Sequence, residues 1–367
     1  MQTRFSTLLG LEYPIAAFSH CRDVVAAVTR AGGLGVLGAS THSPAQLELD
    51  LRWLDETVGG RPYGIDFLFP AAYEGDDQEA LKAHIPDGHR QFLQGMLDRY
   101  AVPSPKNLHE HSRTGDAQIT LERALAQWDV AKDHPVAFVA SALGVPPARV
   151  IEEARARGML LGALVGSPKH VPAQLEAGVD VLVAQGYEAG GHTGTVTTMV
   201  LVPQVVDVAG DVPVLAAGGI ADGRQVAAAM ALGAAGVWTG SVWLTTAESD
   251  TPPLVKRKLL AATSSDTQLS RCSTGKPARQ LSTDWVKAWA APGAPEPLQA
   301  PLQGLLVRDA LVAIEEHEVE PLMGSYVGQV TGMLTSERSS VEVLHEMIEQ
   351  FVLACERLAG FLAGEQG

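Results

Sequence analysis

The chain has few cysteines, few aromatic residues and a shortage of basic charge. Its 367 residues include 3 cysteines and 5% aromatic residues, and 27 Lys and Arg residues stand against 42 Asp and Glu residues. Cys21, Cys272 and Cys355 are far apart and odd in number, which offers no zinc pattern and fits a reducing, cytoplasmic setting. The formal net charge of −15 argues against a protein that binds nucleic acid or an anionic membrane.

Long apolar runs are also missing. No stretch of about 18 consecutive apolar residues exists, so no segment is expected to span a bilayer. Glu12 and Pro14 interrupt the apolar stretch near the start, so no secretory signal peptide is expected. The chain does have 46% hydrophobic residues, enough for a packed core, and 37 glycines that gather in a few places.

Short apolar runs alternate with helical patterns over the first two thirds of the chain. The runs that we take as strands are residues 14–18, 34–37, 63–69, 136–140, 159–165, 181–184, 212–217 and 235–239. Continuous apolar strands that alternate with helices are typical of a parallel sheet buried on both faces. Eight such units predict an α/β protein with a (β/α)8 TIM barrel, and a doubly wound open sheet is the alternative.

Three parts of the chain fall outside this alternation, and one of them is the Gly- and Thr-containing segment of residues 188–202 after the sixth strand. A polar insertion at residues 71–122 follows the third strand, where it could form a lid over the site or a solvated surface excursion. Residues 246–367 contain a Pro/Ala-rich patch and then helical patterns, ending in apolar positions at helical spacing from residue 341 to 362. We expect a barrel of residues 1–245 and a helical C-terminal extension of residues 246–367 packed on it, with a homodimer contact as the alternative use of the last helix.

Glycine-bearing turns follow the seventh and eighth predicted strands. The seventh ends in Gly218 and Gly219, with Asp222 as the expected cap of the next helix, and the eighth ends in Gly240 and Ser241. Glycine lets a backbone approach an anion closely and point N–H groups at it. Phosphate-binding barrels hold the anion after strands seven and eight. The two turns therefore predict a phosphate site, and tight turns without a ligand are the alternative.

A histidine lies in a glycine-rich segment after the sixth predicted strand. The strand ends at Gln185, and Gly190 and Gly191 precede His192. An amide both donates and accepts hydrogen bonds, which suits the pyrimidine edge of a flavin. A histidine with small neighbours can approach a ligand and transfer a proton near neutral pH, although a bond to a loop carbonyl is the structural alternative. Glu188 is expected to be a solvated or loop-fixing carboxylate.

Three motifs resemble the nitronate monooxygenase family, formerly called 2-nitropropane dioxygenases. They are AQGYEAGGHTG, AAGGIADGRQ and GVWTGSVWL, and the resemblance covers most of residues 14–275, including the family's post-barrel motif in STGKPARQL. The resemblance implies a TIM barrel that binds flavin mononucleotide (FMN) and no metal. Flavin-type enoyl-acyl-carrier-protein reductases and some NAD(P)H:quinone reductases share much of the pattern.

The resemblance also implies roles for particular residues. His192 would be the catalytic residue and face the substrate side of the flavin. The glycine turns would hold the FMN phosphate, while strand ends would contact the ribityl chain and the ring. The implied cofactor-binding residues are Ala17, Phe18, Asp66, Gln185, Gly190, Gly191, Gly218, Gly219, Gly240 and Ser241.

The sequence departs from the family pattern at two places. Asp66 stands where the family usually has Asn, and an ionised carboxylate cannot donate to a flavin oxygen and would repel negative charge. Asp66 would then be rotated away, be protonated, or hold the flavin differently. Phe18 and Ser19 stand where the family commonly has Pro-Met, and His20 and Cys21 follow them. Cys21 could be reactive, but a buried structural cysteine is the commoner outcome.

The resemblance implies oxidation of alkyl nitronates with O2 to a carbonyl compound and nitrite. His192 would stabilise the anionic nitronate or act as a base on the neutral nitroalkane. An FMN-dependent NAD(P)H reductase of quinones or enoyl thioesters is the alternative, and no separate dinucleotide fingerprint is evident for it. A non-catalytic binder of a phosphate ligand on the same fold is the third hypothesis.

Overall fold

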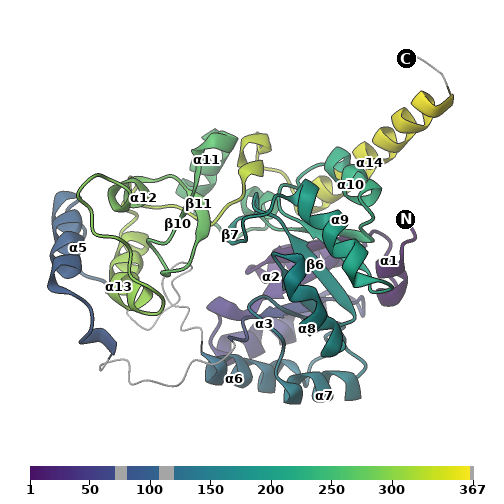
Figure 1. The fold of residues 1–367 in the computed structure, drawn as a ribbon, viewed down its shortest axis with the longest axis horizontal. Helices are drawn as coiled ribbons and strands as arrows, with labels where there is room; N and C mark the ends of the chain where they lie inside the picture. The colour runs from purple at the N-terminus through teal and green to yellow at the C-terminus, as the bar shows by residue number, and fades with distance from the viewer. Residues whose placement is uncertain (71–80, 107–119, 364–367) are drawn as a thin grey trace.

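A closed barrel of eight parallel strands forms one side of the molecule, on the right in Figure 1, in the computed structural model, which describes residues 1–70, 81–106 and 120–363. The strands pair in chain order and the last pairs with the first. They are β1 (Ile15–Ser19), β2 (Leu34–Gly38), β3 (Gly64–Phe67), β4 (Phe138–Ser141), β5 (Leu160–Val165), β6 (Val181–Gln185), β8 (Val214–Ala217) and β9 (Gly236–Thr239). Each predicted apolar run overlaps one of these strands, so the TIM-barrel prediction is confirmed.

Helices connect the strands and cover the outside of the barrel. They are α2 (Arg22–Arg30), α3 (Pro44–Thr57), α6 (Leu121–Ala131), α7 (Ala148–Ala156), α8 (Val171–Glu176), α9 (Thr198–Ala209) and α10 (Gly223–Ala231). The sequence did not predict α6, whose first residues were assigned to the polar insertion, or α9, which contains Pro203. Asp222 caps α10, as predicted, by accepting from the backbone N–H of Gln225.

Aromatic rings fill the interior of the barrel from its N-terminal end. Phe5 on α1 (Arg4–Leu9) packs edge-on to Phe138 of β4 with ring centroids 6.4 Å apart, and Phe138 lies 6.3 Å from Trp238 of β9. A Cβ at Gly162 on β5 would lie 2.2 Å from the Phe138 ring, so only glycine leaves room for that ring. These side chains fill the barrel interior at the N-terminal ends of its strands. The barrel is therefore open at the carboxyl ends of the strands.

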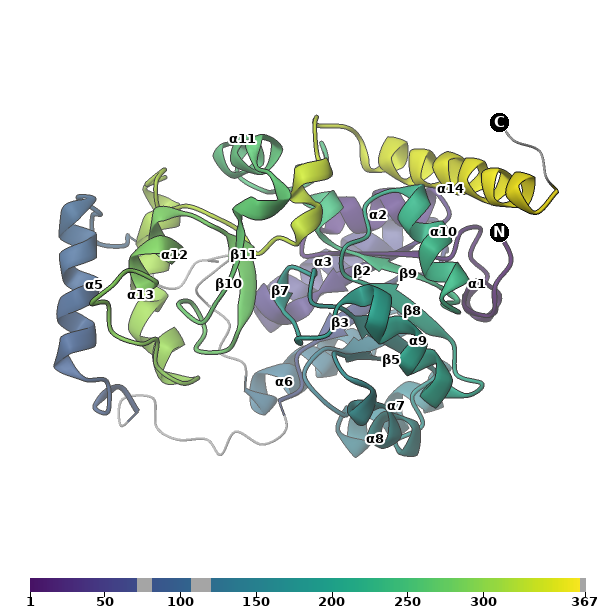
Figure 2. The ribbon, with the colours of Figure 1, turned by 45° about the horizontal axis from the view of Figure 1, so that its top comes forward.

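The chain after β9 forms a second group of elements (Figure 2). It consists of η3 (Ser241–Thr245), α11 (Pro253–Ala261), η4 (Ser264–Asp266), β10 (Thr267–Ser270), β11 (Ala278–Leu281), α12 (Asp284–Trp289), α13 (Leu302–Glu316) and η5 (Gln329–Met333). Strands β10 and β11 were not predicted. They form an antiparallel sheet with β7 (Gly191–His192), which joins this group to the loop that carries the candidate histidine.

The described part of the polar insertion packs against this second group. Its helix α5 (Asp87–Arg99) lies beside α13 (Figure 1), the Phe92 and Trp289 rings are 4.8 Å apart, and the Tyr100 hydroxyl donates to Asp284 at 2.9 Å. Residues 71–80 and 107–119 of the predicted lid lie outside the described residues.

The last helix, α14 (Ser340–Ala363), packs on the chain's own barrel through its first half. Leu344 and Met347 are buried there, and Gly223 on α10 approaches so closely that a Cβ would lie 2.2 Å from the Met347 carbonyl. The second half extends away from the barrel (Figure 2), and Leu353 and Phe361 on it are 63% and 68% exposed. The expected contact between this helix and the barrel is therefore present, and the homodimer contact stays a prediction.

Across the described residues, no helix is both long and apolar enough to cross a membrane. The same residues contain no group of three or more His, Cys, Asp or Glu side chains that could hold a metal ion.

Candidate active site

A cavity of about 350 Å³ opens at the carboxyl ends of the barrel strands and reaches into the second group of elements. Of the eleven site residues that the sequence singled out, all but Ala17 line it. Those that line it are Phe18, Asp66, Gln185, Gly190, Gly191, His192, Gly218, Gly219, Gly240 and Ser241. The fold thus brings together side chains and turns that are up to 223 residues apart in the sequence, counting from Phe18 to Ser241.

The turn after β8 requires glycine. Gly218 and Gly219 have φ values of +91° and +73°, in the left-handed region that other residues rarely adopt. A Cβ at Gly218 would also lie 2.9 Å from the Gly186 carbonyl and 3.1 Å from Oγ1 of Thr198. The turn lies shortly before the N-terminus of α10, whose dipole favours an anion, although N–H groups at the start of that helix already donate to Gln350 and Asp222.

Glu188 fixes this turn from the side. Its carboxylate accepts from the Thr198 backbone N–H at 2.9 Å and from the Thr198 hydroxyl at 2.9 Å. Oγ1 of Thr198 also lies 2.8 Å from the Gly218 carbonyl oxygen. Of the two roles that the sequence left open for Glu188, a solvated or a loop-fixing carboxylate, these bonds support the loop-fixing one.

The turn after β9 contributes the second half of the predicted phosphate site. Gly240 precedes η3, and Ser241 is its first residue. The Ser241 hydroxyl oxygen accepts from the backbone N–H of Gly328 at 2.8 Å. A hydroxyl that accepts one hydrogen bond can still donate its own proton, so Ser241 keeps a donor for an anion in the cavity.

His192 is half-buried on β7 and is held by two neighbours. The Gln185 side-chain amide donates to the His192 carbonyl at 2.8 Å, and Nδ1 of His192 lies 3.1 Å from the carbonyl oxygen of Pro277. Because a carbonyl only accepts, Nδ1 carries the proton, and Nε2 is the unprotonated nitrogen of the neutral ring. Burial lowers the pKa of His192; the bond to Pro277 opposes this shift and the charge of Lys276 adds to it. The ring is thus poised as a neutral base.

Asp66 lies inside the barrel mouth without a charged partner. It is 5% exposed, and its Oδ1 has no hydrogen-bond partner among the described residues. Burial raises the pKa of Asp66 well above its usual value. A carboxyl group in this position fits a ligand that supplies the missing hydrogen bond.

The end of β1 presents Phe18 and His20 to the cavity. The Phe18 ring stacks on Trp238 with centroids 6.0 Å apart, and Nδ1 of His20 donates to the Gly38 carbonyl at 2.8 Å. Cys21 is buried, its Sγ lies 3.2 Å from the Glu248 carbonyl oxygen, and burial raises the pKa of its thiol. Cys21 is therefore the structural cysteine that was expected as the commoner outcome.

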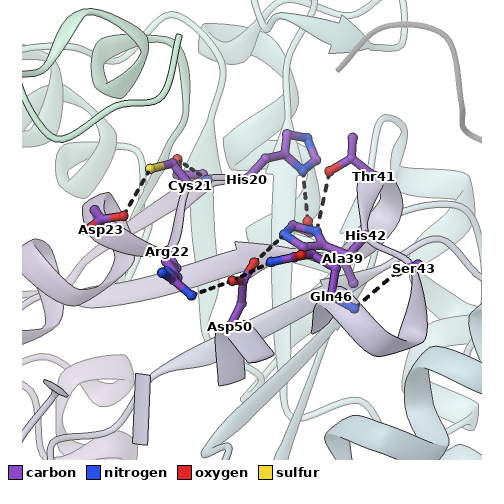
Figure 3. Close-up of polar contacts among 12 residues, drawn as sticks. His20, Cys21, Arg22, Asp23, Ala39, Thr41, His42, Ser43, Gln46 and Asp50 are labelled. Carbon is purple, nitrogen blue, oxygen red and sulfur yellow. Dashed lines mark hydrogen bonds and ion pairs between the residues drawn. The ribbon is translucent and has the colours of Figure 1, made fainter. Parts of the chain in front are cut away.

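A polar cluster behind the cavity was not found from the sequence. Figure 3 shows Arg22, His42 and Gln46 converging on Asp50, with bonds of 2.8, 3.1 and 2.9 Å. Burial raises the pKa of Asp50, but the hydrogen bonds of His42 and Gln46 and the charges of His42 and Arg22 outweigh burial and lower it. The cluster joins α2 to α3, and Thr41 beside it lines the cavity. The one sequence signal for this cluster is that His42 lies just before α3 and Asp50 lies within that helix.

The second group of elements also contributes cavity residues that the sequence did not indicate. They are Leu311, Met323 and Tyr326, among others; Ser273, Thr274 and Gln280 also line the cavity and belong to the STGKPARQL motif that the family resemblance had singled out. No local pattern marks Leu311, Met323 and Tyr326, because they reach the barrel mouth through long-range contacts such as the β7–β11 pairing and the bond between Gly328 and Ser241.

Comparisons with known proteins show which family and which solved folds the chain resembles. The sequence model of the family described as nitronate monooxygenase matches residues 4–350. A Mycobacterium tuberculosis protein provisionally named as a monooxygenase is 50% identical over 373 residues, covering 99% of this chain and 100% of that protein. The solved nitroalkane oxidase of Streptomyces ansochromogenes is similar with a TM-score of 0.79 and 27% identity, over 96% of this chain and 99% of that one. FabK of Thermotoga maritima is similar with a TM-score of 0.73 and 26% identity, over 98% and 99% of the two chains.

Proposed function

Because this chain belongs to the nitronate monooxygenase family and is an oxidoreductase of that family, we propose that it oxidises alkyl nitronates with O2 in an FMN-dependent reaction. The products are a carbonyl compound and nitrite. The observation that carries the proposal is the convergence of His192, the unpaired carboxyl of Asp66 and two glycine-bearing turns on one cavity.

The residues present fit FMN. Gly218 and Gly219 with their positive φ values, together with Gly240 and Ser241, form a cradle in which backbone N–H groups and one hydroxyl can face a phosphate. The polar and small residues at the ends of β1, β3, β6 and β7 line the rest of the cavity, where Phe18, Asp66, Gln185, Gly190 and Gly191 would contact the ribityl chain and the ring. The backbone contact expected of Ala17, which is fully buried in β1, stays a prediction. When bound, FMN supplies the electron transfer from substrate to oxygen.

The protein's part is to position the substrate and to move one proton. His192 is neutral at pH 7 because its pKa is lowered, and its Nδ1–H group donates a hydrogen bond to the Pro277 carbonyl oxygen. Nε2 can therefore take the proton on the α-carbon of a neutral nitroalkane, which converts that substrate to the nitronate. The lowered pKa favours this role over a positive charge that would attract a preformed nitronate anion.

A reductase that uses NAD(P)H with a quinone or an enoyl thioester is the alternative, and the same cavity would serve it. The deciding experiment is an absorbance spectrum of the purified protein, followed by anaerobic addition of propyl nitronate and, separately, NADPH. We expect flavin bands that change with nitronate and not with NADPH. Rapid bleaching by NADPH alone would identify a reductase, and a protein that cannot be loaded with FMN would overturn the cofactor assignment. A cytoplasmic location and the use of O2 and a small-molecule substrate as partners are predictions of the same proposal.

A further inference from the structure

The position of Asp66 is set by the alternation of side chains along β3. Ile65 and Phe67 point outward into the core between the barrel and its helices, where they pack with Trp128. Successive side chains of a strand point to opposite faces, so Asp66 between them points into the barrel. It lines the cavity there and is 5% exposed.

Among the described residues, no charged group compensates Asp66. Strands β2 and β4, which pair with β3 on either side, contain no titratable residue, and neither does η1 (Ala39–Thr41) beside them. The titratable groups that line the same cavity are His20, His192, Asp250, Glu315 and Tyr326. None of them contributes to the raised pKa of Asp66, whose single cause is burial. A buried carboxylate without a partner is strongly disfavoured, and such a group is protonated instead.

We propose that Asp66 is a neutral carboxylic acid that donates a hydrogen bond to the flavin or substrate in the cavity. This inference rests on the proposed function, because FMN is the ligand with which the hydrogen-bond donation is tested. Oδ1 lacks a partner in the part of the chain that the structure describes, so the ligand completes the hydrogen bonding of this group. A protonated carboxyl is a donor like an amide, whereas an ionised one only accepts and repels negative charge. The carboxyl thereby does what an amide would do, and it can also release its proton.

The donation is tested by FMN binding to the full-length, flavin-free protein at pH 6, followed by flavin fluorescence. Asp66→Asn keeps a donor of the same shape, and Asp66→Leu keeps the shape without a donor. We expect the wild type and Asp66→Asn to bind FMN with dissociation constants within about threefold, and Asp66→Leu to bind about tenfold more weakly, as the loss of one buried hydrogen bond predicts. Equal affinity of Asp66→Leu and Asp66→Asn would overturn the donation.

The protonation state is tested without any ligand, by denaturant unfolding between pH 5 and 9. A raised pKa in the folded protein gives stability that is complete below the unfolded pKa, about 4, and is lost as pH rises towards the folded pKa. The unfolding constant of the wild type relative to Asp66→Asn should therefore rise with pH, by up to about tenfold per pH unit. Asp207→Asn, a change at an exposed carboxylate on α9, is the matched control and should show no such slope.

A flat ratio for Asp66→Asn would show that Asp66 is ionised in the folded protein and would overturn the proposal. If neither the wild type nor the variants bind FMN, the cofactor assignment fails and the donation to FMN with it. A sloping unfolding ratio would then still support the neutral acid, so the two failures can be told apart.

Discussion

The backbone N–H of Gly328 donates a 2.8 Å hydrogen bond to Oγ of Ser241. This contact joins the second group of elements to the turn after β9, and Gln329 adds a bond from its N–H to the Glu188 carbonyl at 3.0 Å. Gly328 must be glycine here, because a Cβ would lie 2.6 Å from that same carbonyl oxygen. The close approach leaves the Ser241 hydroxyl proton free to point at an anion in the cavity.

Replacing Ser241 should weaken FMN binding. Ser241→Ala removes a hydroxyl donor to the phosphate and the acceptor for Gly328, and a hydrogen bond to a charged group contributes about 1.5–3 kcal/mol. We expect an FMN dissociation constant about tenfold or more higher, measured by fluorescence titration. Ser282→Ala, at a half-buried serine that does not line the cavity, is the control and should bind as the wild type does. Equal affinities for both variants would remove Ser241 from the phosphate site.

Replacing Gly218 should lower stability as well as FMN affinity. Gly218→Ala combines a left-handed φ of +91° with contacts of 2.9 and 3.1 Å at the new Cβ, so we expect the free energy of unfolding to fall by about 1–3 kcal/mol. Gly59→Ala is the matched control, because Gly59 has a φ of +64° and open space around its Cβ. It should cost about 1 kcal/mol and leave FMN binding unchanged. Urea unfolding measures the loss of stability in both variants. Equal losses in Gly218→Ala and Gly59→Ala would mean that the neighbours of Gly218 move to relieve the close contacts.

His192→Ala should lower turnover of neutral nitroalkanes far more than turnover of preformed nitronates. A positioned general base contributes about 10²- to 10⁴-fold, and a nitronate has already lost the proton. The pH profile of kcat/KM for nitroalkanes should rise through a pKa below the usual value for histidine and level off above it. His317→Ala removes a half-buried histidine that bonds the Ser104 carbonyl and does not line the cavity, and it should leave the rate unchanged. Equal losses with both substrates would exclude the base role.

Stability should fall with rising pH because of His134. Its Nδ1 lies 2.6 Å from Asp55 and its Nε2 lies 3.1 Å from Glu48. Burial lowers the pKa of His134, but the hydrogen bonds to Asp55 and Glu48 outweigh burial and raise it. Stability from this cation is complete below the unfolded pKa, about 6.5, and is lost as pH rises through the folded pKa.

The check on His134 is the unfolding midpoint in urea between pH 6 and 9. The midpoint of the wild type should decline over this range relative to that of His134→Gln, which cannot carry the charge. His84→Gln, on the second group's side of the molecule, is the comparison for a general effect of losing a histidine. Parallel pH profiles of the wild type and His134→Gln would contradict the prediction.

Cys355 should react faster with a thiol reagent than Cys21 and Cys272 do. Cys355 is exposed on α14, whereas Cys21 and Cys272 are buried and burial raises the pKa of both thiols. The thiolate is the reactive form, so a disulfide reagent should label one thiol quickly in the native protein and all three after unfolding. Cys355→Ser should abolish the fast phase. A fast phase that persists in this variant would mean that Cys21 or Cys272 is accessible.

The sequence by itself determined the barrel strands and the glycine-bearing turns at their carboxyl ends, because strands and turns depend on residues that are neighbours in the chain. Apolar runs of four to seven residues predicted each strand, and Gly218 and Gly219 revealed their turn because a left-handed backbone strongly favours glycine. His192 and Gln185 stood out because of their place after a strand. The polar composition of residues 71–122 did not reveal that α5 packs on α13, because those contacts join segments about 200 residues apart.

Only the tertiary structure decided the protonation states of His192 and Asp66 in the cavity. The lowered pKa of His192 comes first from burial and then from Pro277, which opposes the shift, and Lys276, which adds to it; both reach His192 through the pairing of β7 with β11. Whether Asp66 is charged depends on an absence of partners on β2, β4 and η1, which no spacing in the sequence can show. Protonation follows from burial and from through-space neighbours, and both arise only when distant parts of the chain have packed together.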